Sequence, residues 1–218
     1  MRLPLFSRTA PAAWLASLVA AAGVAGGAGL IGAATAATPA SVRIAVVDND
    51  GLPVRDAVVE LHSNTPPQEA IRFPWKMGMA QKDRAFTPGT LIVARGSTVA
   101  FPNLDNVRHS IYSFSKPARF EIELYGRDQT RTQTFNVAGS VKLGCNIHDE
   151  MRGYIRVTDT PFAGKTDQNG HITLSGMASG GARLTVWHPA LRAPGNETTS
   201  AITITGGAQS HKLKVALR

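Results

Sequence analysis

The segment from Gly144 to Met151 most constrains what this 218-residue chain can fold into. It contains the only cysteine of the chain, and His148 and Met151 follow Cys145 at intervals of three residues. A soft thiolate, an imidazole and a weak thioether are the ligands of mononuclear copper in a trigonal His2Cys plane with a long axial Met. Such a plane needs a second imidazole, and His109 upstream is the candidate. The sequence therefore predicts one copper ion in a protein that carries electrons, with four ligands: His109, Cys145, His148 and Met151.

The N-terminal residues are typical of a targeting segment. Arg2 and Arg8 precede a long stretch rich in alanine, glycine, leucine and valine, and Ala34-Thr35-Ala36 is typical of a signal-peptide cleavage site. We therefore expect a signal peptide over residues 1–37 and export to the periplasm. The stretch between Arg8 and Arg43 contains no charged residue and is long enough to span a bilayer, so an uncleaved membrane anchor is the alternative.

The cysteine count and the charge bear on the partners of the exported chain. A single cysteine cannot form an internal disulfide, whereas metal ligation both uses and protects a thiolate. Arg2 and Arg8 are the only charged residues of the signal segment, so its removal lowers the formal net charge from +8 to +6. This positive charge favours a protein redox partner with an acidic surface. The basic residues are scattered and form no basic run, so we expect no nucleic-acid partner.

Short β-branched runs between turn signals predict an all-β protein. The 21 glycines and 13 prolines separate these runs along most of the chain. We expect residues 42–46 and 57–61 to pair as a hairpin across the turn at 48–51. We expect a second pair of strands at residues 90–94 and 98–103.

The last strand before the copper ligands has a clear two-residue period. This period places Val141, Leu143 and Cys145 on one face of the strand, toward the core. Met77 and Met79 also have strand spacing, which favours packing in the core over a separate Cu(I) site.

The remaining polar residues do not indicate catalysis. We expect Asp149 and Glu150 to face solvent and Asp105 to be a turn residue. No Gly-x-Ser-x-Gly nucleophile motif occurs, and zinc or dinuclear copper would need more cysteines or histidines. Whole strands separate three further histidines, which we do not expect to form a second metal site: His171, His188 and His211. We therefore expect neither an enzyme nor a small-molecule substrate.

Several motifs over residues 71–158 resemble the cupredoxin superfamily. They are Phe86-Thr87-Pro88, Phe101-Pro102-Asn103-Leu104-Asp105, His109-Ser110-Ile111-Tyr112-Ser113-Phe114 and Leu143-Gly144-Cys145-Asn146-Ile147-His148-Asp149-Glu150-Met151. Within the superfamily, the chain is most similar to plastocyanin-like proteins often labelled methylamine utilization proteins, and its Cys-x-x-His-x-x-Met spacing is similar to that of amicyanin. The resemblance implies a Greek-key β-barrel and type 1 copper with the four ligands named above.

One residue departs from the cupredoxin pattern. Many cupredoxins follow the upstream ligand His with an Asn whose side chain ties the two ligand loops together, but this chain has Ser110 there. The resemblance therefore leaves the side-chain tie open. Asn103 and Asn146 are candidates to replace it.

The two ends of the chain resemble a second kind of module. Residues 42–66 and 159–218 are similar to the two halves of the prealbumin-like β-sandwich found in carboxypeptidase regulatory domains. Neither half has enough strands to bury a core alone. We therefore expect one discontinuous β-sandwich with the copper domain, residues 71–158, inserted after a linker at 64–69. In the alternative, the first strands belong to the copper barrel and the tail is a separate cap.

These features predict a blue-copper electron-transfer protein that works between a periplasmic dehydrogenase or cytochrome and an acceptor. The alternative is a copper-binding protein for storage or delivery. Delivery favours exposed, exchangeable Met and His ligands without a buried thiolate, so the burial of Cys145 distinguishes the two functions.

Overall fold

The computed structural model describes residues 40–64 and 69–218. The predicted signal peptide at 1–37 and most of the predicted linker at 64–69 lie outside the described residues. Within them, every regular element is a β-strand except a short 3-10 helix, Pro194–Asn196. The all-β prediction is therefore confirmed. No helix of the described part is long and apolar enough to cross a membrane.

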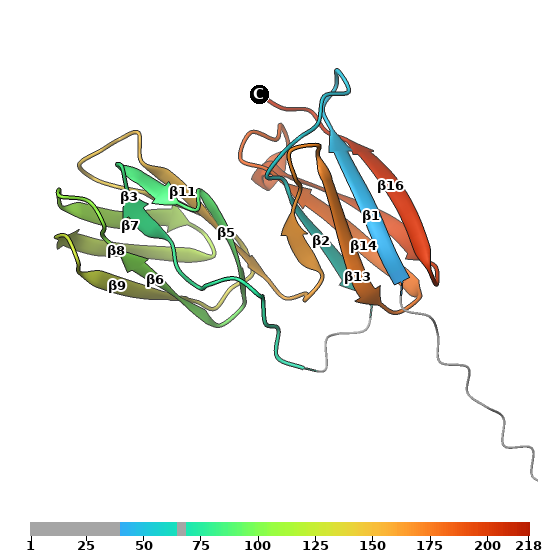
Figure 1. The fold of residues 1–218 in the computed structure, drawn as a ribbon, viewed down its shortest axis with the longest axis horizontal. Coiled ribbons are helices and arrows are strands. Elements are labelled where there is room, and N and C mark those ends of the chain that lie inside the picture. Colours follow the sequence, from blue (N-terminus) through green and yellow to red (C-terminus); the bar gives the residue numbers. More distant parts are fainter. Residues whose placement is uncertain (1–39, 65–68) are drawn as a thin grey trace, which may run out of the picture. The chain divides into compact units, whose positions relative to one another are not determined.

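Strands from both ends of the described chain form two sheets around one core. They are β1 (Ala40–Val47), β2 (Val58–Ser63), β12 (Ala163–Lys165), β13 (His171–Met177), β14 (Gly180–Trp187), β15 (Glu197–Ile204) and β16 (Ala208–Lys214). The sheet orders are β13-β1-β16 and β12-β2-β14-β15 (Figure 1). β1 pairs antiparallel with β13 and parallel with β16. We call this part, with its aliphatic core, the flanking sandwich.

The predicted hairpin over residues 42–61 is wrong, because β1 and β2 lie in different sheets. In β1, Val42, Ile44 and Val46 are fully buried and alternate with more exposed residues, as in a sheet with one face toward the core. In β2, the four residues 58–61 are all buried, which requires cover on both faces. One face packs in the core of the flanking sandwich, and Val58 on the other face belongs to a second buried cluster. Within its own sheet β2 pairs with β12 and β14, and residues 48–57 carry the chain from one sheet to the other.

The strands between these two ends form the region that contains the predicted copper ligands. They are β3 (Ala80–Lys82), β4 (Ala85–Thr87), β5 (Thr90–Ala94), β6 (Ser97–Pro102), β7 (His109–Ser115), β8 (Ala118–Tyr125), β9 (Thr130–Phe135), β10 (Gly139–Gly144) and β11 (Arg152–Thr158). They form a five-stranded sheet, β5-β11-β10-β7-β8, and the two-stranded sheets β6-β9 and β3-β4 (Figure 1). We call this part the ligand region.

The predicted pair of strands at 90–94 and 98–103 is also wrong. β5 pairs in parallel with β11, whereas β6 pairs antiparallel with β9 in another sheet. The turn between β5 and β6 contains Gly96 with φ of 86°, a left-handed conformation that glycine adopts without steric cost. This turn redirects the chain from one sheet to the other instead of closing a hairpin.

The core of the ligand region contains the face that the sequence predicted. Val141 and Leu143 are fully buried and Cys145 is 2% exposed, which confirms the orientation of this strand. Met79 is fully buried in the same core and Met77 packs against it, as predicted for packing residues. Directly after the ligand segment, Gly153 lies against Phe86 so closely that an added Cβ would come within 2.8 Å of the ring. The ligand segment thus leaves and rejoins one packed sheet.

A buried ion-pair network joins β11 to strands of the flanking sandwich. The Arg156 guanidinium donates two hydrogen bonds to the Glu60 carboxylate and one to Glu197 at 2.7 Å. It also donates to the Ser140 hydroxyl at 2.9 Å. Burial alone would raise the pKa of Glu60, but hydrogen bonds from His62 and Arg156 and the Arg156 charge lower it to about 2. We call Glu60, Arg156 and Glu197 the arginine cluster.

Candidate metal centre

Three of the four predicted ligands meet at one end of the ligand region. His109 begins β7, and Cys145 and His148 follow the end of β10. Their potential ligand atoms all lie within 4.8 Å of one another, and Nδ1 of His109 is 3.8 Å from Sγ of Cys145. Nitrogen and sulfur ligands that share one metal ion at normal bond lengths lie about 3.5–3.8 Å apart. The spacing of the side chains therefore suits one metal ion.

The environment of Cys145 stabilises a thiolate. Burial alone would raise the pKa of this thiol, but donors converge on the sulfur and lower the pKa to about 6. The donors are the backbone N–H groups of Ile147, Ser110 and His148. Because the thiolate is the form of cysteine that binds metals, the site holds this sulfur in its ligating state at neutral pH.

His148 supplies an unpaired nitrogen. Its Nδ1 atom is buried and has no hydrogen-bond partner, although buried polar atoms are nearly always paired. The His148 and His109 rings lie 5.0 Å apart between centroids. An unpaired imidazole nitrogen beside a stabilised thiolate fits a soft or borderline metal ion such as copper.

Met151 lies at the base of the same segment. It is 1% exposed, and it belongs to the same buried cluster as Cys145. Its backbone N–H donates to the carbonyl of His148 at 2.9 Å, which closes the segment into a tight turn. The thioether is therefore enclosed with the thiol and withdrawn from solvent. The two intervening acidic residues, Asp149 and Glu150, are exposed as predicted.

Ser110 ties the two ligand-bearing segments together, a role that sequence comparison left open. Its hydroxyl oxygen accepts the backbone N–H of Asn146 at 3.0 Å and lies 3.9 Å from Sγ of Cys145. Asn103 instead fixes its own loop, because its side chain donates to the carbonyls of Val107 and Tyr125. Asn146 donates to Glu121. A serine at this position therefore provides the contact for which two asparagines were candidates.

Asp105 makes a contact with a predicted ligand that sequence reasoning missed. It was expected to be only a turn residue, yet its Oδ2 atom lies 2.8 Å from Nε2 of His109. Burial alone would raise the pKa of Asp105, but hydrogen bonds from Arg84, His109 and Asp83 hold it below its usual range. The only sequence signal was an Asp in the loop that leads into the ligand histidine.

The three histidines that the sequence excluded from a second metal site lie apart from this centre. His171 contacts Arg43, and His211 contacts Gln209. His188 accepts the backbone N–H of Ala190, and burial lowers its pKa. Among the described residues, His109, Cys145 and His148 form the one group of three such side chains that is close enough to hold an ion.

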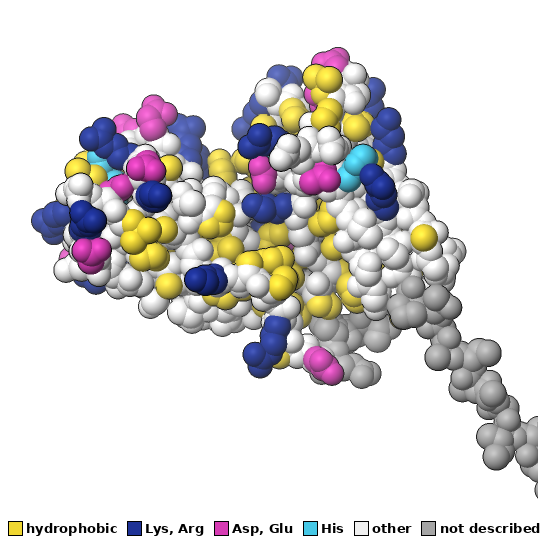
Figure 2. Space-filling view, in the orientation of Figure 1, with side chains coloured by type: hydrophobic (Ala, Val, Ile, Leu, Met, Phe, Trp, Pro, Cys, Tyr) yellow, Lys and Arg dark blue, Asp and Glu magenta, His cyan; other side chains and the backbone are white. Residues whose placement is uncertain are grey.

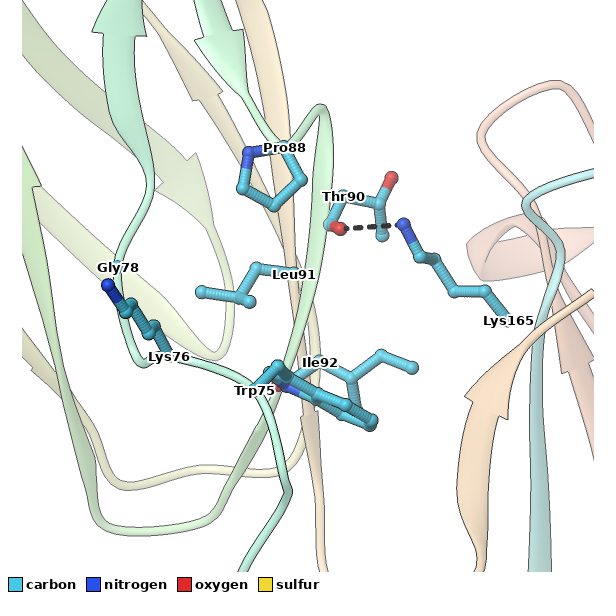
Figure 3. Close-up of a pocket in the computed structure, with 8 residues that line it drawn as sticks. All are labelled: Trp75, Lys76, Gly78, Pro88, Thr90, Leu91, Ile92 and Lys165. Atoms are coloured by element: carbon cyan, nitrogen blue, oxygen red, sulfur yellow. Dashed lines mark hydrogen bonds between the residues drawn. The ribbon is translucent and has the colours of Figure 1, made fainter.

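A mostly apolar pocket of about 340 Å3 lies away from the ligands. Figure 3 shows the residues that line it: Trp75, Lys76, Gly78, Pro88, Thr90, Leu91, Ile92 and Lys165. The Trp75 indole donates to the Ile92 carbonyl at 2.8 Å, and Lys165 contacts the Thr90 carbonyl. None of the predicted copper ligands lines this pocket, and its only titratable residues are two lysines. It therefore offers apolar contact but no acid–base pair.

Several solved copper proteins are similar to part of the chain. A copper-containing nitrite reductase from Thermus scotoductus SA-01 is 25% identical over 44% of this chain and 26% of its own, with a TM-score of 0.37. A purple cupredoxin from Nitrosopumilus maritimus is 20% identical over 37% of this chain and 98% of its own, with a TM-score of 0.34. An amicyanin variant in its reduced Cu(I) form is 21% identical over 46% of this chain and 98% of its own, with a TM-score of 0.36.

The chain thus spans about a quarter of the nitrite reductase. No protein-family model and no curated protein matches the chain. The arrangement of the ligand side chains, rather than these overlaps, supports the function proposed below.

Proposed function

We propose that this protein is a periplasmic type 1 copper protein that transfers electrons and catalyses no reaction of its own. The observation that carries the proposal is the meeting of two imidazole nitrogens and one thiol sulfur: Nδ1 of His109, Nδ1 of His148 and Sγ of Cys145. This combination of two imidazoles and one thiolate is the plane that type 1 copper takes, and Met151 is the candidate axial ligand. Bound copper would supply a one-electron Cu(II)/Cu(I) couple.

The frame around the ligands supports electron transfer. His109 is fully buried, and Cys145 and Met151 are almost so. The strands β7, β10 and β11 hold both ligand-bearing segments in one sheet, and Ser110 joins the segments directly. Ligands on a short segment that is anchored at both ends to packed strands are held close to one geometry when the oxidation state changes. The arrangement therefore suits repeated transfer of an electron without release of the metal.

His148 is the proposed exit for the electron. It is only half-buried, in contrast to His109 and Cys145. The adjacent Ile147 is 50% exposed and lines a hollow of mixed charge, in which apolar Leu124 lies with one basic and two acidic residues: Arg108, Glu121 and Glu123. On the face seen in Figure 2, Lys and Arg side chains lie scattered among acidic and apolar ones. We propose that a protein redox partner with an acidic surface docks beside His148.

The resemblance to amicyanin and to methylamine utilization proteins favours a dehydrogenase or a cytochrome as the partner. Storage or delivery of copper is the alternative function. Exchange with a partner needs accessible ligands, whereas His109 is 0% and Cys145 is 2% exposed. Burial therefore favours electron transfer over delivery.

The visible absorption spectrum of the Cu(II)-loaded protein tests the proposal. Because the Cys145 thiolate would bind the copper directly, an intense thiolate-to-copper charge-transfer band is expected. Cys145→Ser should abolish this band, whereas His211→Ala, a histidine outside the centre, should leave it unchanged. A Cys145→Ser variant with the wild-type band would refute the site. Rapid loss of Cu(I) to a competing chelator, with no reversible redox couple, would favour delivery.

Met151→Leu tests the axial ligand. An axial thioether stabilises Cu(II), so its loss should raise the reduction potential while the charge-transfer band persists. Spectroelectrochemical titration of the two proteins measures this shift. An unchanged or lowered potential would show that Met151 is not axial.

A further inference from the structure

The Asp105 carboxylate lies at the centre of three donated hydrogen bonds. Its Oδ1 atom accepts the backbone N–H of Asp83 at 2.6 Å, and its Oδ2 atom accepts that of Arg84 at 2.9 Å. The same Oδ2 atom is 2.8 Å from Nε2 of His109. The Asp105 side chain is 12% exposed and that of His109 is 0% exposed. A carboxylate with so little access to water exerts its field mainly on these partners.

The turn that supplies two of these donors is held in an unusual conformation. Asp83 and Arg84 have φ angles of 54° and 55°, which are left-handed for residues that are not glycine. They form the two-residue connection between β3 and β4. Left-handed conformations cost roughly 1–2 kcal/mol for each such residue. Because Asp105 accepts both N–H groups, it stabilises this turn, and the turn in return fixes the carboxylate.

The loop that carries Asp105 is fixed as well. The Asp105 N–H donates to the Asn103 side chain at 2.9 Å, and the Leu104 N–H donates to the Gln81 carbonyl at 2.9 Å. The buried Gln81 side chain donates to the Ser110 carbonyl. These bonds connect β3, the Asp105 loop and the start of β7. The position of the carboxylate relative to His109 is therefore set by the fold.

This contact determines which His109 nitrogen carries the proton. An ionised carboxylate can only accept hydrogen bonds, so Nε2 of His109 must be the donor. In the neutral ring, Nδ1 then keeps its lone pair. That atom faces Sγ of Cys145 at 3.8 Å. His148, in contrast, pairs with no carboxylate of the described residues, and its Nδ1 atom has no hydrogen-bond partner.

We propose that Asp105 is a positioning residue that orients His109, fixes its tautomer for ligation through Nδ1, and biases the copper couple toward Cu(II). This inference rests on the function proposed above. A carboxylate bonded to the far nitrogen of a ligand histidine makes the ring a more basic ligand. A more basic ligand stabilises the higher charge of Cu(II), so the reduction potential is lower than it would be without Asp105.

Asp105→Asn removes the charge and keeps the shape. Its Cu(II) affinity should fall by about 10–100-fold, as is typical when such outer partners are lost, and its reduction potential should rise. Asp149→Asn is the matched control, because it removes one negative charge from the ligand segment at an exposed position. Equal potentials and affinities in Asp105→Asn and Asp149→Asn would overturn the proposal.

Asp105→Asn is also tested in a variant whose turn is stabilised, so that disruption of the turn can be told apart from an effect on His109. Asp83→Asn combined with Arg84→Gly places the preferred Asn-Gly pair in the two-residue connection, which lessens its dependence on Asp105. The difference in potential caused by Asp105→Asn should persist in this background. A difference that disappears would show that Asp105 supports only the turn.

The nitrogen NMR spectrum of the copper-free protein separates this inference from the proposed function. Wild-type His109 should show a protonated Nε2 and an unprotonated Nδ1, and Asp105→Asn should change this pattern. Protonation of Nδ1 in the wild-type protein would refute the role of Asp105. The expected tautomer together with no charge-transfer band on Cu(II) addition would refute the copper function alone.

Discussion

Two buried polar clusters of the described residues differ in how completely they are paired. The arginine cluster satisfies itself, because each Arg156 nitrogen has a carboxylate or hydroxyl partner. The metal centre leaves Nδ1 of His148 without a partner and holds a thiol with a pKa near 6. A polar cluster whose atoms all have hydrogen-bond partners contributes to stability, whereas a cluster with an unpaired atom still has a lone pair that can bind a ligand. Because Gln81 Oε1 and Trp187 Nε1 are also buried and unpaired, it is the unpaired His148 nitrogen beside the Cys145 thiol, and not incomplete pairing alone, that distinguishes the candidate centre from the arginine cluster.

The largest expected effect on stability comes from removing the arginine of the arginine cluster while its carboxylates remain. Arg156→Met leaves the Glu60 carboxylate buried without its main partner, so the free energy of unfolding should fall by about 3–5 kcal/mol. Chemical denaturation of the copper-free protein measures the change. The charge-transfer band of the folded, copper-loaded variant should be unchanged.

Two further variants sharpen this result. The double variant Arg156→Met, Glu60→Leu removes both charges and should recover most of the lost stability. Arg183→Met, at an exposed position, serves as the control for loss of an arginine. A loss of less than 1 kcal/mol in the single variant would contradict the structural role of the cluster.

The second-largest expected effect is the loss of stability from the arginine cluster at low pH. The pKa of Glu60 is lowered from 4.5 to about 2, so its contribution is fully present above pH 4.5 and is lost as the pH falls toward 2. The corresponding change in the free energy of unfolding is about 3 kcal/mol. Denaturation curves across this range test it. Glu60→Gln should show a shallower pH dependence, and curves of equal slope would contradict the assignment.

The smallest expected effect on stability comes from the metal centre. Ser110→Ala removes the acceptor of the Asn146 N–H, so the free energy of unfolding should fall by about 1 kcal/mol. The position of the charge-transfer band should shift, because the tie between the ligand segments is lost. Ser113→Ala on the same strand is the control, since its hydroxyl accepts only the nearby Ser115 N–H. A band shifted equally in both variants would show that Ser110 plays no special part.

The sequence predicts the strands of this protein better than their partners. Alternation in β10 correctly identified the buried face, because the two-residue period depends only on local geometry. The same alternation does not determine which strands become hydrogen-bonded neighbours, and both predicted strand pairs, at 42–61 and 90–103, were wrong. The division into domains at 42–66, 71–158 and 159–218 stays a prediction. β1 and β2 nevertheless pair with strands that follow residue 162.

The candidate site shows the same limit. Cys145, His148 and Met151 lie on one short segment, so their spacing alone indicated a shared site. Asp105 lies only four residues before His109, but it was missed because hydrogen bonds from the Asp83–Arg84 turn, more than 20 residues away in the sequence, place its carboxylate. Such contacts are created by tertiary structure, and a local pattern cannot reveal them.

The pairing of β1 with β16 has a consequence for the order in which the chain folds. β1 is the first described strand to be synthesised, and its parallel partner, residues 208–214, is among the last. Contacts between such distant segments form slowly. Until they form, β1 presents an unpaired edge that can join other chains. Residues 80–158 need no partner strand from either end, so they can fold earlier and bring β2 and β12 together. Early folding of the ligand region would then shorten the effective distance between the two halves of the flanking sandwich and speed their pairing.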